Sequence, residues 1–262
     1  KIRALSSSDM IPQDSMQKII SDFFVGYPAT EITYNKFFID DRIAGMRGSA
    51  PITVKYTVDE DSIIELKETV ENCFNDVYDY LSYDFWGRLI KGDSIECCLK
   101  NPNETLRLAL LLKCMIKWWA DNQECSTALQ QFGIRFSIGI GKMRIINQQK
   151  DIMDGEAIYI AGRNLDKISH SYFTSSFDMN SESREFSNLI DNNIKLIDEI
   201  INSLSAKQST VVYLKLLKFT ETEIARKLNI SQSSVNNRLR LSRWKYIHQT
   251  LKLYESLDFY NI

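Results

Sequence analysis

Residues 220–243, TETEIARKLNISQSSVNNRLRLSR, constrain the backbone conformation more than any other stretch of this chain. Thr220, followed three positions later by Glu223, forms a capping box, which predicts the start of a short helix. Asn229 stands where a tight turn needs a left-handed residue, a conformation that asparagine tolerates. Ser231 can cap a second helix. The stretch therefore predicts two short helices joined by a tight turn.

The apolar residues of this stretch are spaced so that the two helices can pack against each other. A close crossing needs a small residue in the first helix, which Ala225 provides, and an apolar residue ten positions later, which Val235 provides. The remaining residues predicted to face inward are Ile224, Leu228, Ile230 and Leu239. This pattern predicts a helix-turn-helix.

The outward face of the second helix is polar, and its residue types suit contacts with DNA. Five side chains are predicted to read base edges in the major groove: Gln232, Ser233, Asn236, Asn237 and Arg240. Three cations are predicted to contact phosphates, which position a protein without specifying sequence: Arg238, Arg243 and Lys245. The alternative is a packing module of three helices that touches no nucleic acid.

The charge of the chain favours the DNA-binding interpretation. Residues 205–262 contain ten Lys and Arg against four Asp and Glu, a balance of +6. Because the whole chain carries −2, the first 204 residues carry −8. A basic C-terminal segment on an acidic body is typical of a module that binds a polyanion, here double-stranded DNA.

Composition limits which other classes of protein this chain can belong to. The five cysteines and the two histidines show no metal-ligand spacing, so we expect neither a zinc site nor a Cys/His catalytic pair, and we expect free buried thiols. The most apolar run, residues 106–119, is interrupted by Arg107, Lys113 and Lys117, which excludes a membrane span. We also find no apolar signal segment and expect a cytoplasmic protein without a membrane partner.

Hydrophobic periodicity predicts an α+β chain with two domains. The expected strands are 2–7, two within 85–99, 132–141 and a short one within 171–177, and the expected helices are 14–24, 61–81, 101–120, 154–168, 188–204 and 206–219. Residues 25–60 are expected to form a hairpin-like insertion. We predict domains at 1–177 and 188–262, joined by a Ser-rich linker at 178–187. After the helix-turn-helix, Trp244, Ile247, Leu251 and Tyr254 form an apolar stripe that is either a packing seam within the chain or a dimer seam.

The order strand, helix, two-strand hairpin, helix, strand resembles the core of class III nucleotide cyclases. The resemblance implies an antiparallel sheet of ferredoxin-like type backed by helices. In that fold two carboxylates hold Mg or Mn against a nucleoside triphosphate, because hard cations prefer oxygen ligands. The matching positions are Asp9 and Asp93, and the segment GEAIYIAGRNL places Arg163 against the triphosphate. The alternative is that both aspartates are turn residues with local hydrogen bonds.

The chain departs from the cyclase pattern at two positions. Tyr159 occupies the place of the asparagine that acts with the arginine, and Leu89, next to Arg88, stands where a lysine reads the base. Each lost donor typically lowers a catalytic rate a hundredfold or more. We therefore expect a degenerate domain that no longer acts as an enzyme.

A second resemblance covers nearly the whole chain. The motifs SSDM, GDSIECCL, RFSIGIG, DGEAIYIAGRNLDKI and EIARKLNISQSSVNNRLR together resemble the SatD family, bacterial proteins with a cyclase-like domain and a C-terminal helix-turn-helix. We therefore expect a DNA-binding transcriptional regulator, a homodimer whose N-terminal domain senses a nucleotide or mediates dimerisation. Two alternatives stay open: a metal-dependent nucleotidyl cyclase or transferase regulated by its helix-turn-helix, and an adaptor that binds only proteins.

Overall fold

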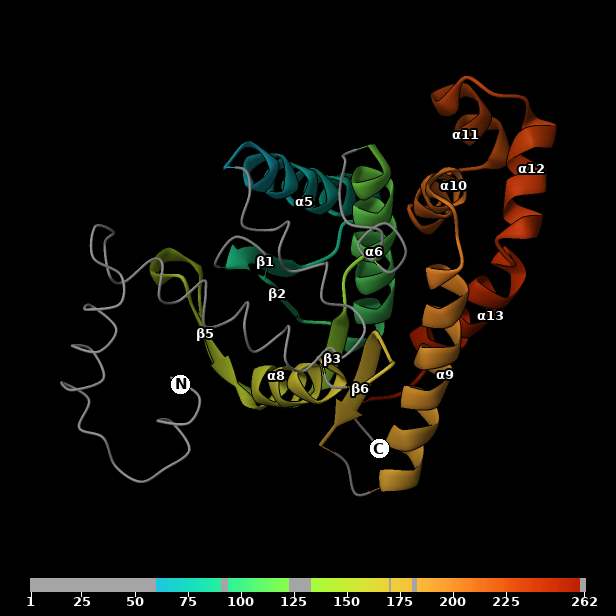
Figure 1. The fold of residues 1–262 in the computed structure, drawn as a ribbon. Helices are drawn as coiled ribbons and strands as arrows, with labels where there is room; N and C mark the ends of the chain where they lie inside the picture. The colour runs from blue at the N-terminus through green and yellow to red at the C-terminus, as the bar shows by residue number, and fades with distance from the viewer. Residues whose placement is uncertain (1–59, 91–93, 123–132, 170, 181–182, 260–262) are drawn as a thin grey trace, which may run out of the picture. The chain divides into compact units, whose positions relative to one another are not determined.

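The computed structural model of the chain describes residues 60–90, 94–122, 133–169, 171–180 and 183–259 (Figure 1). All of them lie in one unit, which runs from Lys55 to Ile262. Helices and strands are interspersed along the described chain up to β6, and helices alone follow it (Figure 1). The chain is thus of the mixed α+β type that was predicted, with a helical C-terminal part.

The described helices and strands follow the predicted order, except that two further strands, which the sequence did not predict, lie between residues 143 and 155. The helices are α5 (Glu60–Leu81), η1 (Pro102–Glu104), α6 (Thr105–Asn122), η2 (Gln148–Lys150), α8 (Glu156–Ser169), α9 (Arg184–Asn202), α10 (Ala206–Leu216), α11 (Glu221–Leu228), α12 (Gln232–Leu241) and α13 (Trp244–Glu255). The strands are β1 (Phe85–Ile90), β2 (Ser94–Leu99), β3 (Phe136–Ile140), β4 (Met143–Asn147), β5 (Ile152–Gly155) and β6 (Ser175–Met179). The predicted strand at 2–7, the predicted helix at 14–24 and the predicted insertion at 25–60 lie outside the described residues, apart from Glu60.

The described strands pair two by two. β1 and β2 form the predicted antiparallel hairpin, in which Phe85 lies opposite Leu99. β4 and β5 form a second antiparallel pair, whereas β3 and β6 are parallel, with Phe136 opposite Ser175. The single antiparallel sheet of ferredoxin-like type is therefore not seen among the described strands, and that finer part of the prediction stays untested.

Helix α6 lies at the centre of the core. Its start follows the predicted signals, because the side chain of Asn101 accepts a hydrogen bond from the backbone N–H of Asn103 and Pro102 opens η1. Leu106, Leu108, Leu110, Leu111 and Ile116 are at most 2% exposed. Helices α5, α9, α10 and α13 and strand β3 all contact α6, so it is surrounded by the rest of the described fold.

The cations that interrupt the apolar run of α6 are buried too. Lys113 and Lys117 are 0% and 1% exposed. Lys113 pairs with Asp198 of α9, and Lys117 Nζ donates to the carbonyl oxygen of Asn202 at 2.8 Å. Burying an ammonium group is costly unless it is paired, so these contacts hold α6 and α9 in one register.

The buried position of Lys117 makes stability depend on pH. Burial, and then the charge of Lys113, lower the pKa of Lys117 to about 8. Above that pH the unfolded chain still holds a proton that the folded chain has released. The free energy of unfolding therefore increases as the pH rises. We expect the free energy of unfolding, measured with urea, to rise more steeply between pH 8 and 10 in the unaltered protein than in Lys117→Met. The difference between the two slopes should reach up to ~1.4 kcal/mol per pH unit. Thiols and tyrosines titrate in both proteins and cancel in the difference; equal slopes would contradict the assignment.

The C-terminal helices pack directly on α6. Arg107 donates to the carbonyl oxygen of Leu216 in α10 and to Glu255 in α13, both at 2.7 Å. The amide of Asn103 donates to the carbonyl oxygen of Leu257 at 2.6 Å, just after α13. Residues 178–179 of the predicted linker belong to β6 and residues 184–187 to α9, so only 180–183 connect the two elements. The predicted domain boundaries themselves stay a prediction.

The apolar stripe of α13 is a packing seam within the chain. Ile247 and Leu251 are fully buried, and Tyr254 is 3% exposed. All three belong to the main core cluster, together with α6 and α9 residues. Of the two alternatives left open by the sequence, packing within the chain is the one that the structure shows for these residues.

Helix α5 buries one face against the core. Leu66, Val70 and Phe74 are buried on it, whereas Ile64 is 54% exposed. Four cysteines are described and all are free; burial raises the pKa of Cys73 to about 12, so that thiol is unreactive.

Within the described chain, no helix combines the length and the apolar character that crossing a bilayer requires.

Candidate nucleic-acid interface

The first helix of the unit, α11, begins as the sequence predicts. The N–H of Glu223 donates to Thr220 Oγ1 at 3.3 Å, and the N–H of Thr220 donates to Glu223 Oε2 at 2.8 Å. Both halves of the capping box are therefore formed. Hydrogen bonds from the Thr220 side chain and backbone lower the pKa of Glu223, which keeps this carboxylate ionised at the helix N-terminus.

The turn between α11 and α12 has the predicted left-handed residue. Asn229 has φ 51° and ψ 47°, and its N–H donates to the carbonyl oxygen of Arg226 at 3.3 Å. The N–H of Ile230 donates to the carbonyl oxygen of Ala225 at 3.0 Å. Ser231 then caps α12 by accepting from the N–H of Ser234 at 3.2 Å. Local hydrogen bonds thus fix the angle between the two helices.

A small core lies beneath the two helices. Val211 of α10, Ile224 of α11 and Val235 of α12 are fully buried, and Leu239 is 6% exposed. Ala225, Leu228, Ile230 and Trp244 pack against them and are partly buried. The residues predicted to face inward therefore do so, and the opposite face of α12 is left to solvent.

All five predicted base-reading side chains are exposed on α12. They are Gln232, Ser233, Asn236, Asn237 and Arg240. The Nη2 of Arg240 donates to Asn237 Oδ1 at 3.0 Å, which restricts both side chains before any DNA binds. In the part of the chain that the structure describes, no neighbouring element covers these groups. Whether they contact DNA stays a prediction.

The predicted phosphate-binding cations lie at the C-terminal end of the same helix. Arg238 is half-buried, whereas Arg243 and Lys245 are exposed. Arg243, with φ 56°, lies between α12 and α13 and separates the two helices. Lys245 Nζ lies 4.7 Å from the ring centroid of Tyr246. Among the described acidic side chains, none forms an ion pair with these three cations. Their charge is therefore open to an outside anion.

The predicted nucleotide site is described only at Arg163. Asp9 and Asp93 lie outside the described residues, so their predicted metal binding is not tested. Arg163 is exposed on α8, and its Nε donates to the carbonyl oxygen of Tyr159 at 3.3 Å. Tyr159, at the position of the cyclase asparagine, donates its hydroxyl to Asp154 at 2.7 Å. Among the described residues, no three His, Cys, Asp or Glu side chains gather to hold a metal ion.

One polar cluster in the structure was not predicted from the sequence. Lys167 of α8 and Arg184 and Lys195 of α9 surround a cavity over β6, beside Asp178 and Asp191. The sequence carries no signal for it, because the five residues come from three elements whose packing is not local.

Comparison with known proteins supports the helix-turn-helix. Residues 194–245 match the family "Sigma-70, region 4". The match begins within α9, continues through α10, α11 and α12 and ends at the start of α13. No curated protein and no solved structure matches the chain. The C-terminal part of this chain is therefore similar to a helix-turn-helix region of the DNA-binding, transcription-regulating type.

Proposed function

We propose that this protein regulates transcription by binding double-stranded DNA through α12. The observation that carries the proposal is the polar face of α12, whose side chains are exposed above a buried core and are covered by no described element. The similarity of residues 194–245 to sigma-70 region 4 supports the same role. The +6 balance of residues 205–262 supplies the attraction to the phosphate backbone.

The two ends of the polar face have different proposed roles. The N-terminal part carries the neutral amides Gln232, Asn236 and Asn237 and enters the major groove, where amides pair with adenine N6 and N7. Arg240, held by Asn237, and Ser233 complete the base-reading set. Arg238, Arg243 and Lys245 contact phosphates and set the register of the protein on the duplex.

We predict that the double variant Arg243→Asn/Lys245→Gln weakens binding to every duplex. Each phosphate contact contributes about 0.9 to the slope of log affinity against log salt, so we expect a slope shallower by about 2. Asparagine is chosen because it tolerates the left-handed backbone at position 243. Gel-shift titrations between about 50 and 200 mM salt measure both effects.

Lys150→Gln is the matched control, because Lys150 is an exposed cation outside the helix-turn-helix. It should leave both affinity and slope unchanged. If the unaltered protein shifts no duplex from its own genome at moderate salt, the proposed function is wrong.

For the N-terminal part we propose a sensor or dimerisation role, within a homodimer that responds to a nucleotide. The resemblance to class III nucleotide cyclases supports this role. The alternative, a metal-dependent nucleotidyl cyclase or transferase, rests on Asp9, Asp93 and Arg163. Incubation with the four ribonucleoside triphosphates and Mg or Mn separates the two, because only an enzyme forms cyclic or oligomeric product. An adaptor that binds only proteins would show neither DNA binding nor product.

A further inference from the structure

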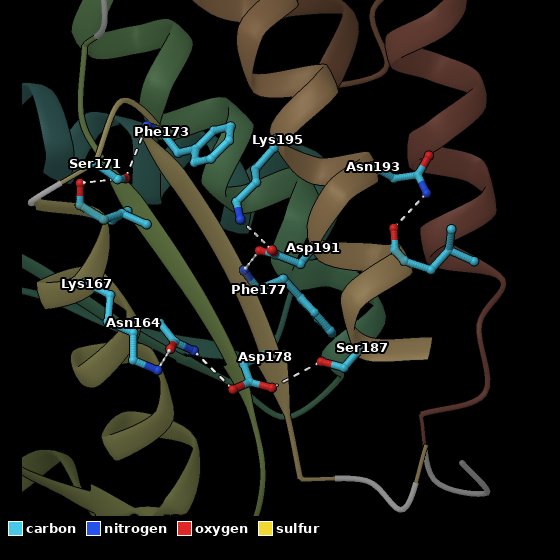
Figure 2. A network of polar contacts seen from close by, with 12 residues as sticks. Asn164, Lys167, Ser171, Phe173, Phe177, Asp178, Ser187, Asp191, Asn193 and Lys195 are labelled. Carbon is cyan, nitrogen blue, oxygen red and sulfur yellow. Dashed lines mark hydrogen bonds and ion pairs between the residues drawn. The ribbon is translucent and has the colours of Figure 1, made fainter. Parts of the chain in front are cut away.

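A cavity lies over β6, between helices α8 and α9. Figure 2 shows Asn164 and Lys167 reaching it from α8 and Asp191 and Lys195 from α9, on either side of the strand. Its volume is about 270 Å³, slightly below the range of roughly 300–1,000 Å³ that is usual for ligand pockets. The cavity therefore has room for a small molecule.

The carboxylates of this cavity are already used by the protein. Asp178 accepts from Arg184 Nη1 at 2.8 Å, from the N–H of Met179 at 2.9 Å and from Ser187 Oγ at 3.1 Å. Burial alone would raise the pKa of Asp178, but hydrogen bonds and the charge of Arg184 outweigh it and lower the pKa, so the group is ionised.

Asp191 is engaged in the same way. It accepts from the N–H of Phe177 at 2.8 Å and from Lys195 Nζ at 2.6 Å (Figure 2). The two acidic side chains of the cavity therefore bind the protein's own donors, and neither is the natural partner of a cationic ligand.

The cations of the cavity, in contrast, have more N–H groups than their contacts within the protein use. Each lysine ammonium has three N–H groups. Lys167 Nζ donates to Asn164 Oδ1 at 3.0 Å, and Lys195 Nζ lies 4.6 Å from the ring centroid of Phe173 besides its bond to Asp191. Arg184 is 65% exposed and carries five N–H groups. Three cations against two carboxylates leave a charge of +1 around the cavity, with N–H groups free to donate.

We propose that this cavity binds a small molecule through a phosphate group. A phosphate offers several acceptor oxygens and a double charge, which fits the spare donors of three cations that line one cavity better than a neutral or cationic ligand does. Lys167 would hold it from α8, and Arg184 and Lys195 from α9. Because the match to sigma-70 region 4 begins at residue 194, within α9, the ligand would join the α/β part to the start of the proposed DNA-binding unit.

The proposal is tested by titrating the full chain with inorganic phosphate and with pyrophosphate in a calorimeter, at constant ionic strength and without DNA. We expect saturable binding at one site, weakened about five- to tenfold by Lys167→Gln or by Arg184→Gln and more strongly by the pair. Both side chains are exposed, so neither change is expected to disturb the fold.

Two controls place the site. Lys150→Gln removes an exposed cation that does not line the cavity, and Arg243→Asn/Lys245→Gln removes cations from the helix-turn-helix; neither should change phosphate binding at the cavity. The proposal is overturned if phosphate binds no better than chloride, if the Lys167/Arg184 double variant binds as the unaltered protein does, or if either control abolishes binding. The titration does not depend on the DNA-binding role, so each can fail without the other.

Discussion

Replacing Asp198 with asparagine is expected to lower the free energy of unfolding by about 3–5 kcal/mol, which corresponds to a loss of roughly 10 °C in melting temperature. Asp198 is 2% exposed and pairs with the fully buried Lys113. It also accepts from the Thr174 hydroxyl, which in turn accepts from Lys113 Nζ at 3.0 Å and from Asn202 Nδ2 at 2.9 Å. The substitution removes the ion-pair partner of the fully buried Lys113 ammonium group.

Urea and thermal unfolding measure this effect, and two variants control it. Asp84→Asn breaks an ion pair with Lys100 in which both side chains are at least 69% exposed, so it should cost at most about 1 kcal/mol. Replacing both partners, as Lys113→Met/Asp198→Leu, should recover much of the loss, because it removes the unpaired charge. A cost below about 1 kcal/mol for Asp198→Asn would mean that the buried pair does not hold α6 to α9.

Removing both leading amides of α12, as Gln232→Ala/Asn236→Ala, is expected to weaken binding to the preferred duplex by about 30- to 20,000-fold. Each bidentate pair between an amide and adenine contributes about 1–3 kcal/mol, and 1.4 kcal/mol is a factor of ten. Binding to unrelated duplexes should hardly change, because neutral side chains release no counterions. Competition gel shifts with a selected duplex and with random DNA measure the two affinities.

The matched control is Gln149→Ala, an exposed amide outside the helix-turn-helix. Both residues of the double variant are exposed, so its melting temperature should stay close to that of the unaltered protein. The base positions at which the variant loses selectivity should carry adenine on one strand. Equal weakening on preferred and random DNA would show that the amides do not read bases, while DNA binding itself would still stand.

The sequence predicted those parts of the fold that short stretches control by themselves. The capping box of Thr220 and Glu223 and the left-handed Asn229 each depend on hydrogen bonds within a few residues, and both are found as predicted. The hairpin of β1 and β2 and the cap at Asn101 are local in the same sense. The polar face of α12 follows, because its residues lie opposite the inward positions Val235 and Leu239.

The hairpin of β4 and β5 escaped prediction for a physical reason. Its connection is the 3₁₀ turn η2, closed by Asp151 with φ 53°, instead of a glycine turn. Its residues Ile145 and Ile146 are both about half exposed, so the strand lacks the alternation of a half-buried strand.

The local sequence thus determines the helix-turn-helix, since its caps, its turn and its helix faces are fixed by neighbours along the chain. Only the tertiary structure shows that Lys113 and Lys117 are buried against Asp198 and Asn202, and that Lys167, Arg184 and Lys195 meet around one cavity. Lys113 and Asp198, like Lys117 and Asn202, lie 85 positions apart, and the three cations of the cavity come from two different helices, so helix packing decides which of these groups meet, and no local pattern encodes it.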